Sequence, residues 1–154
     1  MAVIDLGSPA IDRAAAFGAS RTVINRLSPS TEDGFITSVS VYSAGSSSGV
    51  KIGIFYNTSG NDYAVRSLAS PVSIVAGLNT FSVNLAVEVG DFIGIYIPST
   101  SIDINPSGAT NGSANAFGDQ TASTATYTLN DFTLSLEATG STVSPANGNF
   151  FMLM

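Results

Sequence analysis

Apolar and polar residues alternate with a period of two along several segments of the chain. The clearest are residues 35–42, with Phe35, Thr37, Val39 and Val41 on one face, and residues 50–56, with Val50, Ile52, Ile54 and Tyr56 on one face. Successive side chains of a strand point to opposite faces, so this period predicts two strands that each bury one face. The Ser- and Gly-rich residues 43–49 between them predict a turn, and the two strands are expected to form a hairpin.

The same reading predicts strands at residues 63–68, 72–75, 81–85, 92–97, 124–129 and 132–137. Turn residues rich in Gly, Pro, Asn and Asp separate these segments, and Asn130-Asp131 predicts a tight connection between the last two. Short strands at regular spacing are typical of sandwiches and barrels. We therefore expect an all-β fold, an antiparallel jelly-roll-like β-sandwich built as a single domain.

Three regions depart from this alternation. Residues 10–17 contain three consecutive alanines and predict at most one helical turn, within an N-terminal arm and first strand that span residues 1–26. Residues 105–123 are rich in Gly, Ser, Asn and Ala and predict a long loop, and loops of that length are usually functional or disordered. Residues 140–154 form a C-terminal extension of the single domain, which spans residues 1–154.

The end of this extension consists of five apolar residues after a polar stretch: Phe150, Phe151, Met152, Leu153 and Met154. An exposed apolar run of this kind promotes association. It is expected either to complete a sheet of its own domain or to form an interface with a neighbouring subunit.

Charge and composition narrow the classes of partner. Only 10% of the 154 residues are charged, and the net charge is −6, so Ser, Thr, Asn and Gly must supply most of the surface. Five Lys and Arg residues do not make the basic cluster that a nucleic acid requires. The sequence contains neither an apolar run long enough to span a membrane nor the features of a signal peptide.

Few residues of the chain are candidates for catalysis or metal binding. The chain lacks Cys and His, which removes thiolate chemistry and the commonest general base. A pair of carboxylates could still support glycoside hydrolysis, and we keep this as an alternative. Calcium is the cofactor to consider, because Asp103, Asn105 and Asp119 offer the oxygen ligands that it prefers.

Aromatic residues leave a carbohydrate-binding or adhesive module open as a second alternative. There is no Trp, and Tyr42, Phe55, Tyr56, Tyr63 and Tyr96 lie within alternating strands, where core packing is the better interpretation. Sugar recognition would then fall to the polar residues 105–123.

Three segments resemble a recurring pattern in small jelly-roll proteins found among phage and environmental viral sequences. They are GFITSVSVY at residues 34–42, GVKIGIFY at residues 49–56 and VGDFIGIY at residues 89–96, and the opening DLGSPAIDR at residues 5–13 is similar to the start of such proteins. The resemblance covers residues 4–138. It implies a virion structural role in capsid decoration, a head fibre or a tail, and it transfers no catalytic residue.

The sequence thus predicts a non-enzymatic virion protein that presents a neutral polar surface and assembles as a homo-oligomer, with a trimer favoured by analogy to viral sandwiches. Its expected partners are further copies of itself and capsid or tail proteins, with cell-surface glycans as the alternative. Nucleic acid and membrane are not expected partners.

Overall fold

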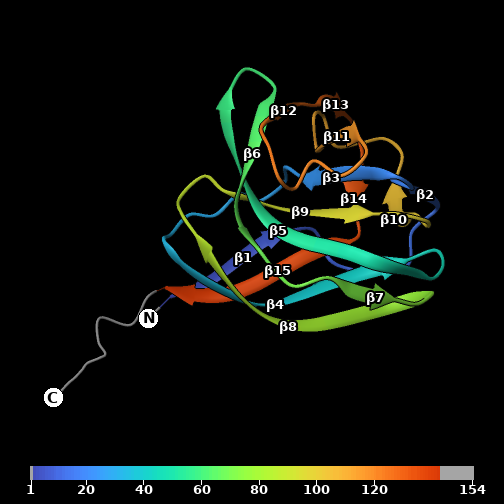
Figure 1. The fold of residues 1–154 in the computed structure, drawn as a ribbon, viewed down its shortest axis with the longest axis horizontal. Coiled ribbons are helices and arrows are strands. Elements are labelled where there is room, and N and C mark those ends of the chain that lie inside the picture. The colour runs from blue at the N-terminus through green and yellow to red at the C-terminus, as the bar shows by residue number, and fades with distance from the viewer. Residues whose placement is uncertain (1, 143–154) are drawn as a thin grey trace, which may run out of the picture.

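A computed structural model describes residues 2–142 and contains strands but no helix within that range. Two antiparallel sheets pack face to face as a sandwich (Figure 1). The predicted all-β antiparallel sandwich is therefore confirmed. Since no helix lies between residues 2 and 142, no helical membrane span is found there.

The first sheet has seven strands and contains both ends of the described chain. Its order is β1-β15-β4-β10-β14, with β8 beside β4 and β2 beside β10. The strands are β1 (Val3–Gly7), β2 (Ala15–Phe17), β4 (Gly34–Ser43), β8 (Gly77–Val87), β10 (Ile102–Asn105), β14 (Thr133–Leu134) and β15 (Leu136–Thr142).

The second sheet has eight strands in the order β12-β6-β5-β9-β3-β11-β13, with β7 beside β5. The strands are β3 (Arg21–Asn25), β5 (Ser47–Ser59), β6 (Asp62–Leu68), β7 (Val72–Ile74), β9 (Phe92–Ile97), β11 (Ser113–Phe117), β12 (Ala125–Thr126) and β13 (Thr128–Asn130). The far end of β5 and the start of β6 project beyond the sandwich as a hairpin (Figure 1).

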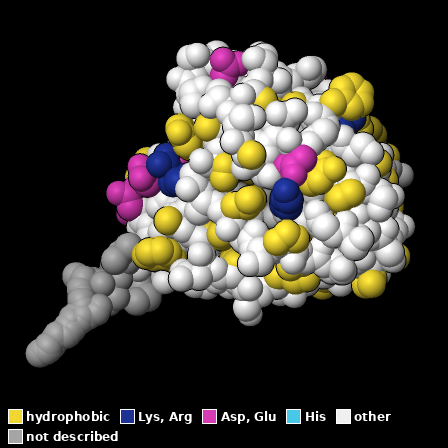
Figure 2. All heavy atoms as spheres, viewed as in Figure 1, with side chains coloured by type: hydrophobic (Ala, Val, Ile, Leu, Met, Phe, Trp, Pro, Cys, Tyr) yellow, Lys and Arg dark blue, Asp and Glu magenta, His cyan; other side chains and the backbone are white. Residues whose placement is uncertain are grey.

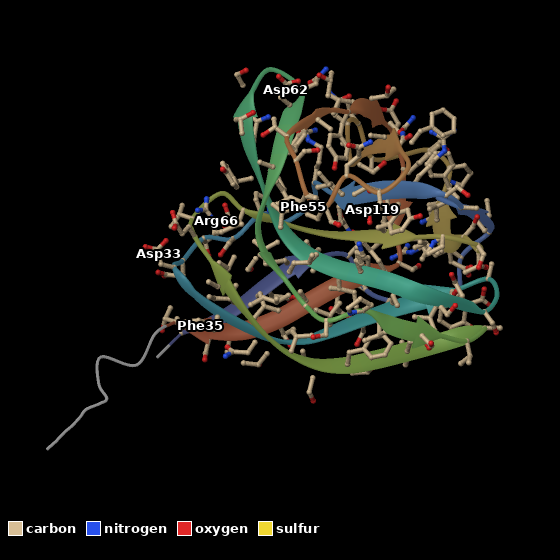
Figure 3. The ribbon with its side chains drawn as sticks, viewed as in Figure 1. Asp33, Phe35, Phe55, Asp62, Arg66 and Asp119 are labelled. Carbon is tan, nitrogen blue, oxygen red and sulfur yellow. The ribbon has the colours of Figure 1, made fainter. Side chains whose placement is uncertain are left out.

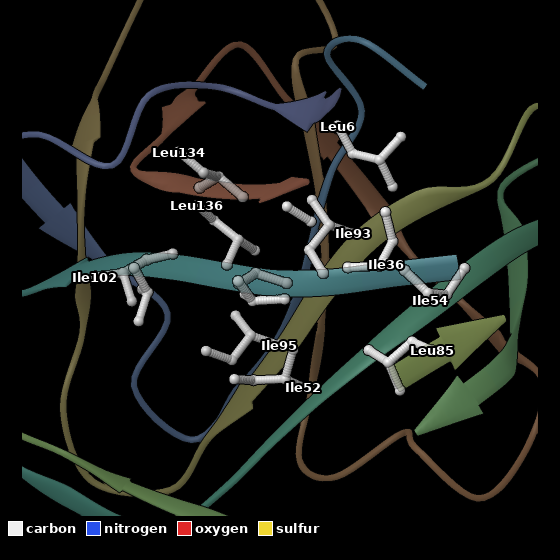
Figure 4. Close-up of a cluster of buried hydrophobic side chains, with 14 of the residues drawn as sticks. Leu6, Ile36, Ile52, Ile54, Leu85, Ile93, Ile95, Ile102, Leu134 and Leu136 are labelled. Carbon is white, nitrogen blue, oxygen red and sulfur yellow. The ribbon is translucent and has the colours of Figure 1, made fainter. Parts of the chain in front are cut away.

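Alternate residues of both sheets fill the space between them. Figure 4 shows aliphatic side chains from β1, β4, β5, β8, β9, β10, β14 and β15 meeting in one cluster, including Leu6, Ile36, Ile52, Ile95 and Leu136. All five are at most 1% exposed. Burial of this apolar surface is the main stabilising contribution that the period-two pattern encodes.

A second, smaller cluster lies on the other side of the eight-stranded sheet. It consists of Ile24, Phe55, Tyr63, Ala114 and Tyr127. The rings of Tyr63 and Tyr127 meet edge to face with centroids 5.3 Å apart. Phe55 and Tyr63 are therefore core residues, as the sequence predicted.

The predicted buried face of β4 was wrong at its first two residues, Phe35 and Thr37, which are both exposed. Phe35 is 40% exposed, whereas Ile36, Val39 and Val41 are fully buried. A β-bulge causes the change, because Gly140 of β15 pairs with Ile36 and Thr139 with Ser38, and the pairing with β8 also shifts register between Ile36 and Ser38. One extra residue in a strand moves the side chains beyond it to the opposite face.

The hairpin predicted from the turn at residues 43–49 was also wrong. Strands β4 and β5 lie in different sheets, and β5 instead pairs with β6, β7 and β9. The tight connection predicted at Asn130-Asp131 is present between β13 and β14, but β13 pairs with β11 in one sheet and β14 with β10 in the other, so it carries the chain between sheets.

Residues 105–123 do not form one long loop. Residues Ser113–Phe117 form β11, which lies between β3 and β13. Residues 10–17 contain no helical turn, and their last three form β2 beside β10. In the N-terminal region, β1 pairs with β15 and β3 pairs with β9, so residues 3–7 and 21–25 belong to the two sheets.

Candidate functional site

The predicted calcium ligands are distributed over both sheets. Asp103 and Asn105 lie on β10 of the seven-stranded sheet, whereas Asp119 follows β11 of the eight-stranded sheet. The buried Asp103 carboxylate accepts a hydrogen bond of 3.0 Å from the backbone N–H of Arg13. Across residues 2–142, no group of three or more Asp, Glu, His or Cys side chains is placed to hold a metal ion. The calcium site stays a prediction, because its three proposed ligands lie in two different sheets.

Asp119 instead forms an ion pair across the eight-stranded sheet. Its Oδ2 atom lies 2.6 Å from Nζ of Lys51 on β5, and its Oδ1 atom accepts hydrogen bonds from Thr121. Partial burial opposes ionisation, but the hydrogen bonds from Lys51 and Thr121 prevail and lower the pKa of Asp119. Nearby, burial and the charge of Asp119 raise the pKa of Tyr127. The Tyr127 hydroxyl is buried and has no hydrogen-bond partner within the described residues.

A second ionic cluster joins β6 to the turn between β8 and β9. Nε of Arg66 donates to Oδ2 of Asp91, and Nη1 of Arg66 lies 3.1 Å from Oε2 of Glu88. The hydrogen bond to Asp91 is the largest reason why the pKa of Arg66 is raised. Figure 3 shows Arg66 and Asp119 at separate places, so these two ion pairs do not form one site.

The surface between these clusters is largely uncharged. Figure 2 shows a face dominated by neutral polar atoms, with scattered hydrophobic side chains and two places where basic and acidic side chains adjoin. A pocket of about 400 Å³ lies between residues 68–72 and residues 82–85 of β8. It is lined by Ala, Leu, Pro, Val, Ser and Asn side chains, and none of them supplies a general acid or base.

The outer surface of the seven-stranded sheet is a continuous feature, which we call the hydroxyl face. Cross-strand neighbours share a face of an antiparallel sheet, so the pairing of β1, β15, β4 and β8 gives its rows directly. The rows are Val3–Ser141–Phe35–Ala86, Asp5–Thr139–Ser38–Ser82, Gly7–Glu137–Ser40–Thr80, and Tyr42–Leu78. Seven of these fourteen residues carry a hydroxyl, and only Asp5 and Glu137 carry charge.

An aromatic and basic cluster lies where β2, β3 and β11 end, and we call it the Phe117 corner. It consists of Phe17, Arg21, Asn115, Phe117 and Phe132. Phe117 is 71% exposed, among the most exposed large apolar side chains of the described chain. In the sequence, Phe117 is a single bulky residue between Ala116 and Gly118 in a segment of otherwise small residues. The period-two pattern does not extend through this segment and so gave no reason to select Phe117.

The predicted interface Phe150, Phe151, Met152, Leu153 and Met154 lies outside the described residues. Of the C-terminal extension, residues 140–142 belong to β15. Comparison with known proteins finds no matching family model, no matching curated protein and no matching solved structure.

Proposed function

We propose that this protein is a non-enzymatic structural protein of a virion, which assembles with further copies of itself through its hydroxyl face. The observation that carries the proposal is the hydroxyl face itself. It is a broad sheet surface that combines hydroxyl side chains with exposed apolar residues at both ends, and the segment at Ala10 reaches it at Glu137, whose Oε1 accepts a hydrogen bond from the Ala10 N–H.

The chemistry of the face favours contact with another protein surface. Phe35 is 40% exposed at one end, and Leu78 is 59% exposed at the other. Between them, the side chains of Ser40 and Thr80 form a hydrogen bond of 3.0 Å with each other. Hydroxyls that are already paired lose less on desolvation than unpaired ones, so burying this surface is not strongly penalised.

The distribution of charge favours the β4–β8 half of the hydroxyl face as the place where two copies meet. The protein carries a net charge of −6, so most contacts between copies place like charges near each other. On the hydroxyl face both carboxylates, Asp5 and Glu137, belong to β1 and β15, and the half formed by β4 and β8 carries none. Copies that meet with this half at the centre of the contact, and with β1 and β15 at its edge, reduce the repulsion.

The size of the face is adequate for an interface. Four strands at about 4.8 Å spacing and about ten residues of β4 and β8 give a projected area on the order of 600 Å². A stable interface takes roughly 800 Å² of accessible surface from each partner. The exposed side chains at both ends bring the face close to this value.

The virion assignment rests on the resemblance of residues 4–138 to small viral jelly-roll proteins and on the low surface charge. A capsid-decoration, head-fibre or tail-associated protein needs a stable scaffold with contact surfaces. Several carboxylates that a hydrolase would need have structural partners here, because Asp91, Asp103 and Asp119 each accept hydrogen bonds within the fold. A trimer remains the favoured assembly by analogy.

Sedimentation velocity over a range of protein concentrations tests the proposal. Thr80→Arg places a charge at the centre of the β4–β8 half, and Thr124→Arg places the same charge on an exposed residue after β11. We expect the Thr80 variant to weaken self-association by about thirtyfold or more, since a buried unpaired charge costs several kcal/mol. The Thr124 variant serves as the matched control.

A wild-type protein that stays monomeric at high concentration, or a Thr80 variant that assembles like the wild type, would overturn the assembly proposal. Mass spectrometry of purified virions from the source of the sequence tests the location separately. Absence of the protein from such particles would overturn the virion role while leaving self-assembly intact.

A further inference from the structure

In the Phe117 corner, a guanidinium group lies between two aromatic rings from different sheets. The Cζ atom of Arg21 is 3.6 Å from the ring centroid of Phe117 and 5.2 Å from that of Phe17. Phe17 in turn meets Phe132 edge to face, with centroids 5.0 Å apart. Arg21 therefore links Phe117 to the pair of rings formed by Phe17 and Phe132.

Backbone contacts also hold Phe117 in position. Phe117 pairs with Arg21 across β11 and β3, and its carbonyl oxygen accepts a hydrogen bond of 2.7 Å from Nε2 of Gln120. One face of its ring lies against the guanidinium, yet the side chain remains 71% exposed. A rigid, exposed ring with an accessible side is a platform on which a flat apolar surface can stack at little entropic cost.

Arg21 has hydrogen-bonding capacity that the fold does not use. Its Nη1 atom donates to Oδ1 of Asn115 at 2.7 Å, and between residues 2 and 142 it forms no other side-chain hydrogen bond and no ion pair. By contrast, Arg66 pairs with both Asp91 and Glu88. The remaining N–H groups of Arg21 suit a planar, negatively charged acceptor such as a carboxylate.

We propose that the Phe117 corner binds an acidic carbohydrate, a pyranose that carries a carboxylate. The C–H groups of the sugar pack against the exposed rim of the Phe117 ring, beside the guanidinium that lies 3.6 Å from its centroid, and the carboxylate accepts hydrogen bonds from the free edge of Arg21. Asn115 orients that edge by holding Nη1. The site lies on β3 and β11, away from the strands of the hydroxyl face, so it goes beyond the proposed assembly and stands independently of it.

The corner fits this ligand better than a nucleic acid. Its one cation is Arg21, whereas binding to a phosphate chain requires several clustered cations, and a single carboxylate requires only one. A neutral sugar would use Phe117 but leave the guanidinium without an anionic acceptor.

Isothermal titration calorimetry with trigalacturonate tests the proposal, with galactotriose as the neutral counterpart of the same length. We expect binding of trigalacturonate that is weakened about tenfold or more in Phe117→Ala and in Arg21→Met, because each variant removes one of the two contacts. Phe117→Tyr retains the stacking surface and should restore affinity. Val89→Ala, which truncates another exposed apolar residue on the β8–β9 turn, should bind like the wild type.

Thermal unfolding of each variant separates loss of binding from loss of fold, and Phe117→Ala is the safer variant because its side chain is mostly exposed. Absence of trigalacturonate binding by the wild type, equal binding of galactotriose, or unchanged affinity in Phe117→Ala would each overturn the proposal. Equal binding of a short Glu-containing peptide that competes with trigalacturonate would also overturn it and indicate a protein partner instead. Sedimentation velocity is independent of this site, so failure here is distinguishable from failure of assembly.

Discussion

Nδ2 of Asn25 donates a hydrogen bond of 2.9 Å to the backbone carbonyl of Leu136 and so joins β3 of one sheet to β15 of the other. The same amide nitrogen also contacts Oγ of Ser8 at 3.1 Å, and the whole side chain is buried. Polar groups inside a sandwich are stable only when they are paired. Asn25 therefore fixes the relative position of the two sheets at this end of the core.

Asn25→Ala should lower the free energy of unfolding by about 3 kcal/mol, because it leaves the Leu136 carbonyl without this donor and opens a cavity. Chemical denaturation monitored by fluorescence of the five tyrosines measures the change. Asn84→Ala on the exposed side of β8 is the control and should change stability by less than about 0.5 kcal/mol. Equal effects of the two substitutions would contradict this role for Asn25.

The ion pair between Arg66 and Asp91 has one deeply buried partner. The Asp91 side chain is 2% exposed, whereas Glu88, which also contacts Arg66, is 60% exposed. Arg66→Met should destabilise the protein by about 3 kcal/mol, because it leaves a buried carboxylate without its counter-ion. Glu88→Gln removes only the exposed partner and should cost less than about 1 kcal/mol. Thermal unfolding of both variants under the same conditions provides the comparison.

The β-bulge between β4 and β15 requires a glycine at position 140. A Cβ atom there would lie 1.9 Å from the carbonyl oxygen of Phe35, a distance that forces the two strands apart. Gly140→Ala should therefore destabilise the fold by about 3 kcal/mol. Gly60→Ala, at a hairpin position with φ of 52° and open space around it, should cost only about 1 kcal/mol. Urea denaturation would distinguish these two values.

The ion pair between Lys51 and Asp119 makes part of the stability depend on pH. The pKa of Asp119 is lower in the folded protein than its ordinary value, so the unfolded chain binds a proton first as the pH falls. The contribution is present above about pH 4, the ordinary pKa of Asp, and is lost as the pH falls through the lower pKa of the folded state.

Asp119→Asn should consequently be less stable than the wild type near neutral pH, with a difference that narrows as the pH is lowered from about 6 to about 3. Because both partners are about one-third exposed, the effect is small and should decrease further in high salt. Thermal unfolding as a function of pH and salt measures it. A difference that widens at low pH would contradict this sign.

The sequence predicted the fold better than it predicted the candidate sites. The calcium hypothesis grouped Asp103, Asn105 and Asp119 by their positions in the chain, but β10 and β11 belong to different sheets. The Phe117 corner was missed because its parts come from separate segments. Arg21 and Phe117 are nearly one hundred residues apart, and only the pairing of β3 with β11 brings them together.

By itself, the sequence determined that the chain forms strands, because a period-two pattern stabilises a fold only when alternate side chains are buried. It also determined that the surface is largely uncharged, because only 10% of the residues carry charge and these are too few to cover the exterior. The tertiary structure decided which strands pair. Asn130-Asp131 has the residues of a hairpin turn, yet it links the two sheets, because β13 and β14 pair with partners more distant along the chain. Strand pairing is a long-range choice set by closure of the shared core, and no local window of sequence contains that information.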